Sequence, residues 1–116
     1  MGVDIDGVLD AFPAEMLMLL SSITSGGNRV FIITGIESDE DPEKSDLDNK
    51  EAYLTGLGFG KGSYFKLIVI SQPHDTNKAK AIEDNSISML FDNSKKNCRA
   101  AKSLCPCFLL WQTKED

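Results

Sequence analysis

The sequence predicts an α/β fold with a mostly parallel five-stranded sheet, and three observations support this. Short apolar runs alternate with segments of helical periodicity along the chain. The apolar runs are continuous, as in strands that are buried on both faces of a parallel sheet. Segments rich in glycine, serine and asparagine separate these elements. Such an alternation places helices on both faces of the sheet, which gives a three-layer, Rossmann-like architecture.

The predicted elements follow one another in a regular order. The strands are a very short one that ends at Val3, then residues 30–33, 67–70, 87–91 and 107–111. Helices are expected at residues 12–23, 50–57, 76–84 and 94–103, with an acidic loop at residues 35–49. The sequence shows no sign of a second domain, so residues 1–116 are predicted to form a single domain.

The net charge, the cysteines and the apolar stretches argue against some classes of function. The formal net charge of -6 argues against general binding to the phosphate backbone of nucleic acids. A small phosphorylated substrate is still compatible with that charge if a metal ion supplies positive charge. The three cysteines do not form the pattern of a disulfide framework, which favours a reduced, cytoplasmic compartment. The apolar stretches are too short to span a bilayer, so neither membrane attachment nor a signal peptide is expected.

Polar and charged residues stand where the predicted strands end. Asp4 and Asp6 follow the first strand, and Thr34 and Gly35 follow the second. Lys78 lies in the helix after the third strand, and Asp92 and Asn93 follow the fourth. Ligands of parallel α/β sheets bind outside the carboxyl ends of the strands. We therefore expect these groups to gather at one edge of the sheet.

This combination of groups suits phosphoryl transfer. A carboxylate can attack phosphorus and form an aspartyl-phosphate. A second carboxylate two residues further on can protonate the leaving oxygen and then activate water. A hydroxyl, backbone N–H groups and an ammonium can hold the remaining phosphoryl oxygens. Oxygen ligands of this kind also suit Mg²⁺, which bridges to phosphate oxygens.

Four segments, in chain order, resemble the motifs of the haloacid dehalogenase (HAD) superfamily. The sequence DIDGVL at residues 4–9 resembles the first motif, D-x-D-G-[TV]-L. The sequence FIITG at residues 31–35 resembles the second motif, and Lys78 fits the lysine of the third. The sequence LFDNS at residues 90–94, continuing to Asn97, is similar to the fourth. The resemblance covers nearly the whole chain.

The resemblance implies catalytic and substrate-binding roles. Asp4 would be the nucleophile, and Asp6 would be the general acid and base. Thr34 and Lys78, together with Gly35, would hold the phosphoryl group of the substrate. Lys80 is an alternative to Lys78, but the spacing from Lys78 to Asp92 better suits one helix and one strand between them.

The resemblance also implies a Mg²⁺ cofactor. Its ligands would be Asp4, Asp6 through its backbone carbonyl, Asn93 and Asp92. Asn93 stands where many family members have a second acid. The small C-terminal-domain phosphatases of the family carry a similar Asp-Asn-Ser sequence there, with the asparagine as a metal ligand. An amide oxygen is an acceptable ligand for Mg²⁺.

The chain looks like a minimal HAD core without a cap domain. The intervals that hold a cap in other family members are filled here by single helices, a loop and a strand. An open site of this kind either admits a large substrate or is covered by a neighbouring subunit of a homo-oligomer.

The expected function is a Mg²⁺-dependent phosphomonoester hydrolase, acting on a nucleotide or another small phosphorylated metabolite. A second interpretation stays open, in which the chain is a catalytically weak or inactive HAD-like protein that binds or regulates a partner. The short first strand and Asn93 motivate it. So does Ile36, because many relatives carry an arginine after the Thr-Gly pair.

Overall fold

The computed structural model describes residues 1–36 and 44–110. Its strands, all parallel, are β1 (Gly2–Val3), β2 (Phe31–Gly35), β3 (Lys66–Ile70), β4 (Leu90–Asp92) and β5 (Cys107–Leu109). They lie in the order β3-β2-β1-β4-β5. The helices are α1 (Pro13–Ser25), α2 (Lys44–Leu57), α3 (His74–Asp84) and α4 (Lys95–Ala101), and an irregular turn, η1 (Ile5–Leu9), follows β1.

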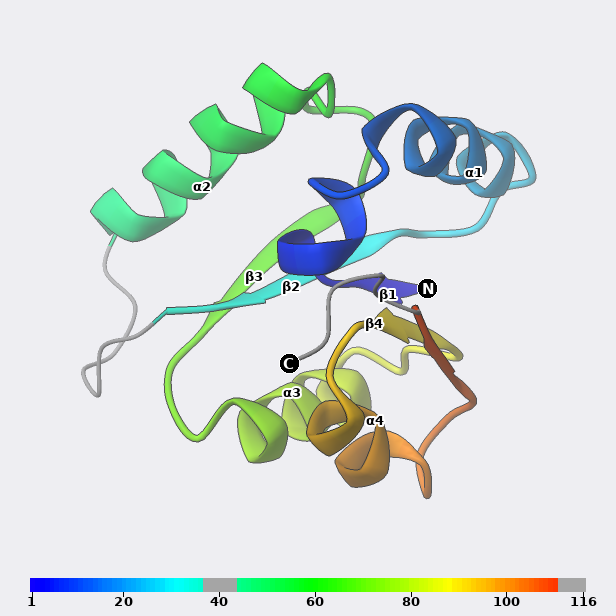
Figure 1. Ribbon diagram of the computed structural model, residues 1–116. Helices are drawn as coiled ribbons and strands as arrows, with labels where there is room; N and C mark the ends of the chain where they lie inside the picture. The colour runs from blue at the N-terminus through cyan, green and yellow to red at the C-terminus, as the bar shows by residue number, and fades with distance from the viewer. Residues whose placement is uncertain (37–43, 111–116) are drawn as a thin grey trace.

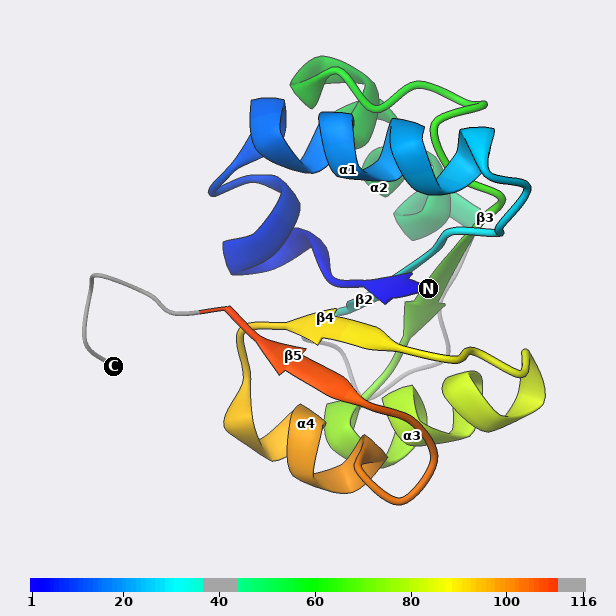
Figure 2. The same ribbon diagram turned by 90° about the vertical axis from the view of Figure 1, so that its right-hand side faces the viewer.

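The helices cover both faces of the sheet. Helices α1 and α2 lie on one face, and α3 and α4 on the other (Figure 1), as the view from the side also shows (Figure 2). This arrangement confirms the predicted three-layer, Rossmann-like α/β fold, with a sheet that is parallel throughout the described strands. No helix in the described part of the chain combines the length and apolar character needed to cross a bilayer.

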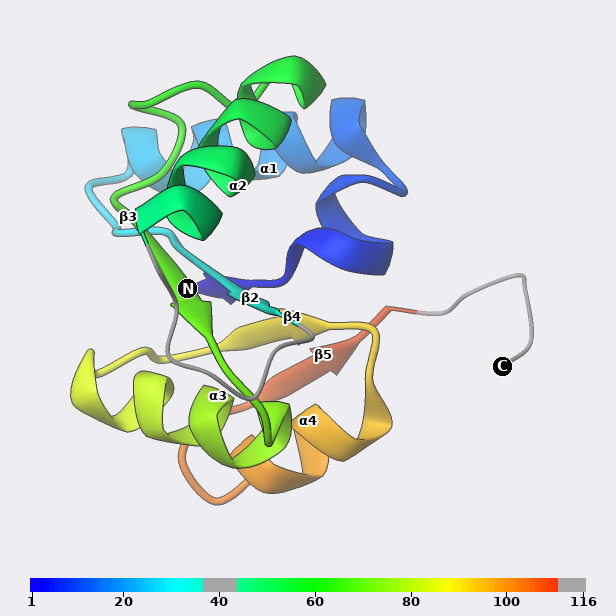
Figure 3. The same cartoon turned by 90° about the vertical axis from the view of Figure 1, so that its left-hand side faces the viewer.

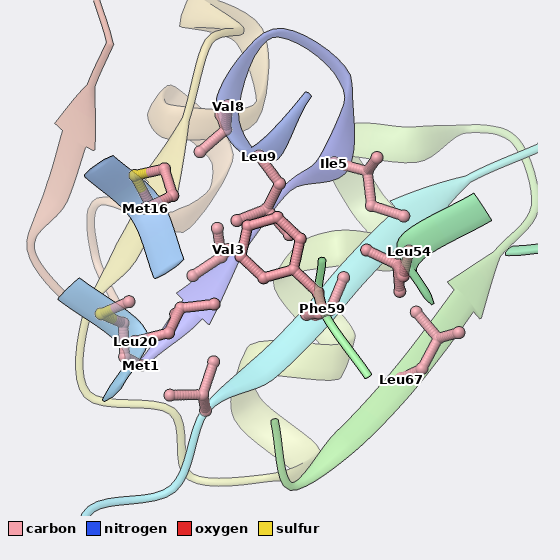
Figure 4. Packing of buried hydrophobic residues seen from close by; sticks show 12 residues of the cluster. Met1, Val3, Ile5, Val8, Leu9, Met16, Leu20, Leu54, Phe59 and Leu67 are labelled. Atoms are coloured by element: carbon pink, nitrogen blue, oxygen red, sulfur yellow. The ribbon is translucent and has the colours of Figure 1, made fainter. Parts of the chain in front are cut away.

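Two apolar clusters hold the layers together. The first, between the sheet and helices α1 and α2, includes Leu20, Leu54 and Phe59 (Figure 4). The second lies beneath the opposite face and includes Ile33 of β2 and Ile82 of α3. Because successive strand residues point to opposite faces, an unbroken apolar run serves both clusters. Each fully buried side chain of this size contributes about 1.5–3 kcal/mol to stability.

The central strand β1 is as short as the sequence predicts. Gly2 and Val3 pair with β2 on one side and with β4 on the other. Three further backbone hydrogen bonds extend this pairing: Gly2 N to Met89 O (2.7 Å), Phe31 N to Met1 O (2.8 Å) and Asp4 N to Phe91 O (3.1 Å). The backbone of Asp4 is thus fixed to the neighbouring strand directly after β1 ends.

The prediction of a loop over residues 35–49 is wrong at its C-terminal end, because α2 already begins at Lys44. Residues 37–43 lie outside the described part of the chain. The signal for the longer helix is the helical spacing of Leu47, Leu54 and Leu57, which all pack in the first apolar cluster. Asp46 in the first turn also stabilises the helix, because a negative charge is favourable near a helix N-terminus.

The predicted strand over residues 87–91 is also too long, since β4 begins only at Leu90. The preceding residues end α3 instead. The backbone N–H of Ile87 donates to Ile82 O at 3.0 Å, and Ser86 takes a left-handed conformation with φ 52°. These residues close the last turn of the helix before the chain can enter the sheet. At the last strand, β5 is described to Leu109, and Trp111 lies outside the described residues.

Candidate active site

Two carboxylates and one ammonium meet at the carboxyl edge of the sheet. Asp4 follows β1, Asp92 ends the adjacent β4, and Lys78 reaches both from α3. The Nζ atom of Lys78 lies 2.7 Å from Asp92 Oδ2 and 3.6 Å from Asp4 Oδ1. All three residues are buried, with Asp92 fully inaccessible and Lys78 only 2% exposed. The sequence-predicted residues at these positions therefore lie together.

The buried cluster carries surplus negative charge. With both carboxylates ionised, two negative charges and one positive charge leave a net charge of −1. Burial raises the pKa of Asp4 to about 6, with Lys78 acting in the opposite direction and Asp92 adding to the rise. Deep burial without full compensation is costly for a carboxylate. The surroundings of Asp4 therefore favour a nearby cation.

Asp92 is held in one orientation by three donors. Its Oδ1 accepts from the backbone N–H of Ser94 at 2.9 Å. Its Oδ2 accepts from Lys78 Nζ at 2.7 Å and from Asn97 Nδ2 at 3.2 Å. Ser94 also caps α4 by accepting from Asn97 N at 3.2 Å. Asp92 thus fixes the position of the Lys78 ammonium, and Asn93 follows it half-buried.

The hydroxyl of Thr34 has no partner among the described residues. Thr34 lies near the carboxyl end of β2, next to β1, and is completely buried. Its Oγ1 forms no hydrogen bond with any residue that the structure describes. A buried polar atom without a partner costs about 1–3 kcal/mol, so such atoms are uncommon in folded proteins. An orphaned hydroxyl at the ligand-binding edge of the sheet is well suited to hold a ligand oxygen.

Replacing Thr34 by valine is expected to separate stability from function. The substitution removes the unpaired hydroxyl and retains a β-branched side chain, so the free energy of unfolding should stay the same or rise by about 1 kcal/mol. Ligand binding or turnover should fall nevertheless. Urea denaturation measures the first effect, and phosphate-ester turnover the second. A loss of more than 1 kcal/mol would show that the hydroxyl already has a structural partner.

The turn after β1 separates the two aspartates of the first motif. Asp4 is buried, whereas Asp6 is exposed. Gly7 follows with φ 75°, a left-handed conformation that a side chain would disfavour, and its N–H donates to Asp10 Oδ1 at 2.7 Å. Two carboxylates in such different environments are suited to different chemical roles.

His74 occupies the space beside Gly35. The sequence indicates a loop histidine, but the structure places it at the start of α3, after the cis Gln72–Pro73 bond. Its Nε2 lies 2.6 Å from Ile36 O, and a Cβ added at Gly35 would lie 2.7 Å from the imidazole ring. Any larger residue at position 35 would displace this ring. The substrate-binding role of Gly35 stays a prediction.

Lys78 and Lys80 lie on different sides of α3, and this difference distinguishes them. Lys78 lies one turn after His74 and faces the sheet, where it meets both carboxylates. Lys80 is exposed. Helical residues four positions apart share a face, whereas those two apart do not. The geometry therefore favours Lys78 as the lysine of the site.

The oxygen donors at this edge fit Mg²⁺. Among the described residues, no three acidic, histidine or cysteine side chains cluster as a ready-made metal site. Mg²⁺ does not require such a cage, because it is usually held by one or two carboxylates together with waters and substrate phosphates. Asp4 supplies a buried carboxylate, and the same edge of the sheet carries the buried hydroxyl of Thr34 and the half-buried Asn93. The donor set is compatible with that mode of binding.

Comparisons with known proteins agree on the fold. No family model matches the chain, and no curated protein matches its sequence. It is similar to a HAD family enzyme from Bacteroides thetaiotaomicron, an aspartate-to-alanine mutant in complex with magnesium and inorganic phosphate. The TM-score is 0.57 at 16% identity, over 89% of this chain and 55% of that chain. Our chain therefore spans about half the length of that enzyme.

A second solved structure points to a different family. It is a protein of the universal stress protein family from Burkholderia pseudomallei, with a TM-score of 0.50 and 14% identity. The match covers 94% of both chains. Together, the two similarities define a three-layer α/β class with a parallel sheet. At these low identities they establish the fold and not the function.

Proposed function

We propose that the protein is a Mg²⁺-dependent phosphomonoester hydrolase in which Asp4 is the nucleophile. The observation that carries this proposal is the buried hydroxyl of Thr34, which has no hydrogen-bond partner within residues 1–36 and 44–110. It lies at the same sheet edge as Asp4 and Lys78, so a hydroxyl and an ammonium are available for oxygens of a phosphoryl group. The similar HAD family enzyme in complex with magnesium and phosphate adds weaker support.

The reaction would proceed in two displacements at phosphorus. In the first, a carboxylate oxygen of Asp4 bonds to phosphorus while the ester P–O bond breaks, and Asp6 gives its proton to the departing alcohol. In the second, Asp6 takes a proton from water, and the water oxygen displaces the Asp4 carboxylate from phosphorus. Inorganic phosphate leaves and both aspartates return to their initial state. Lys78 and Thr34 stabilise the phosphoryl oxygens throughout.

The metal would be held by Asp4, Asn93 and the backbone carbonyl of Asp6, with Asp92 next to it as the anchor of Lys78. When bound, Mg²⁺ offsets the negative charge that the carboxylates and the phosphoryl group bring together. Asp92 already accepts three hydrogen bonds, so we propose that it contributes less to metal binding than Asp4 and Asn93 do.

The proposed substrate is a small phosphorylated metabolite or a nucleotide in the cytoplasm. The net charge of -6 disfavours long polyanions, which bind through many lysines and arginines. We infer a core without a cap domain, for which a second subunit of a homo-oligomer would be a suitable cover.

A screen of phosphomonoesters with and without Mg²⁺ tests this function. We expect turnover of at least one ester with Mg²⁺, its loss on addition of EDTA, and its recovery with excess Mg²⁺. Thermal unfolding in EDTA serves as the control that the protein stays folded without the metal. Absence of turnover on a broad set of esters would reject the hydrolase.

A second candidate is a HAD-like protein that binds a ligand or a partner without turnover. The fold match does not single out an enzyme, because the universal stress protein is matched over 94% of both chains and the HAD enzyme over 55% of its length. The tight pairing of Lys78 with Asp92 also favours a structural role for that lysine. Binding of phosphate together with Mg²⁺ in the absence of turnover would support this candidate.

A further inference from the structure

The turn that carries Asp6 is connected to α2 through Tyr53. The Tyr53 hydroxyl donates to Asp10 Oδ2 at 3.5 Å, and Asp10 Oδ1 accepts from the N–H of Gly7 at 2.7 Å. Gly7 directly follows Asp6. The turn η1 and helix α2 lie on the same face of the sheet (Figure 3). A residue far along the chain is thereby placed beside the proposed general acid.

The negative charges of this turn also act on the Tyr53 hydroxyl. Desolvation, followed by the negative charges of Asp10 and Asp6, raises the pKa of Tyr53. Both carboxylates belong to the turn after β1, whereas Tyr53 belongs to α2. Tyr53 nevertheless stays 47% exposed, so about half of the residue is accessible to a ligand.

The position of the leaving group follows from the proposed reaction. A general acid must lie within hydrogen-bond reach of the oxygen that it protonates. The group attached to that oxygen therefore lies next to Asp6, and Tyr53 contacts the same turn through Asp10. An exposed aromatic ring favours flat apolar partners, because offset or edge-to-face ring contacts add to the burial of area.

We propose that Tyr53 is a specificity-determining residue that contacts the leaving group and favours phosphomonoesters with an aromatic leaving group. This inference rests on the proposed function, since it takes Asp6 as the general acid. It assigns α2 part of the role that a cap domain would otherwise have. An alternative role for Tyr53 is to stabilise the turn through its hydrogen bond to Asp10. That role depends on the hydroxyl and not on the ring.

Two substitutions in the full chain separate the ring from the hydroxyl. Tyr53→Phe retains the ring and removes the contact with Asp10, whereas Tyr53→Ala removes both. The substrates are 4-nitrophenyl phosphate and glycerol 2-phosphate, which share the phosphoryl group and differ in the leaving group. We expect Tyr53→Ala to lower the kcat/KM ratio of the aryl over the alkyl ester about 5- to 10-fold, and Tyr53→Phe to change it less than about 2-fold. Equal losses on both esters, or equal losses in both variants, would overturn the proposal.

A binding measurement keeps this test separate from the test of hydrolysis. Phenylphosphonate and methylphosphonate resist hydrolysis and differ only in the group on phosphorus. Calorimetric titration in Mg²⁺ should show tighter binding of phenylphosphonate to the unaltered protein, and Tyr53→Ala should remove this preference. If the protein turns over no ester, the proposed hydrolase fails, but the phosphonate preference still decides the role of Tyr53. Absence of a preference in the unaltered protein would overturn the inference.

Discussion

Replacing Asp4 by asparagine is expected to lower kcat for an aryl phosphate by about 10³-fold or more, because a carboxamide is a far weaker nucleophile than a carboxylate. The fold should be retained. The side-chain oxygen of asparagine can still accept from the N–H of Ile5, as Asp4 Oδ1 does at 2.9 Å. Lys78 keeps Asp92 as its partner at 2.7 Å. Steady-state kinetics with Mg²⁺ measures the loss, and circular dichroism with thermal unfolding verifies the fold.

Asp84→Asn is the matched control for this variant. Asp84 is exposed at the C-terminal end of α3, so the same chemical change there should leave kcat within about 2-fold of the unaltered protein. Metal-dependent turnover that persists in Asp4→Asn at a comparable rate would remove Asp4 from the role of nucleophile. A loss of activity together with a loss of structure would instead assign Asp4 to the fold.

Replacing Lys78 by methionine is expected to lower the free energy of unfolding by about 3–5 kcal/mol, because it leaves the buried carboxyl of Asp92 without its cation. Methionine retains most of the length and volume of the aliphatic stem, so the main loss is the charge. Lys80→Met changes an exposed lysine of the same helix and should alter stability by less than about 0.5 kcal/mol. Urea denaturation of the three proteins measures both differences.

A second substitution identifies the cause of the loss. Adding Asp92→Asn to Lys78→Met removes the unpaired charge while its donors Ser94 and Asn97 remain, so the double variant should recover part of the stability. Similar effects of Lys78→Met and Lys80→Met would contradict the burial of the ion pair. A double variant less stable than Lys78→Met would show that the carboxylate is needed for reasons other than charge.

The sheet and its functional edge could be predicted because they depend on local patterns. Continuous apolar runs identify strands that are buried on both faces, and the strand–helix alternation determines that they are parallel. The carboxyl-end rule then gathers Asp4, Thr34 and Asp92 without any knowledge of side-chain positions. The boundaries of the helices and strands are harder to predict from the sequence. Ile87 is apolar and strand-like, yet its N–H is taken by the last turn of α3.

The remaining parts of the site depend on contacts between distant segments. Tyr53 lies 43 positions from Asp10, and His74 lies 38 positions from Ile36, so no local spacing connects them. The sequence identifies Asn97 only as the end of a motif, because its hydrogen bond to Asp92 depends on where α4 begins. The unpartnered state of Thr34 Oγ1 is likewise a property of the complete packing and not of the residue type.

The two-residue strand β1 has a consequence for the order in which the protein is assembled. Its partners lie in β2 and in β4, and Asp4 is tied to Phe91 by its backbone N–H. During synthesis β1 is made before both of its partners, and β4 follows only after β2, α2, β3 and α3 have been made. In a nascent chain that lacks β4, β1 would pair with β2 only. Lys78 would then lack Asp92 as its partner. The full set of contacts around Asp4 is therefore available only after β4 has been made.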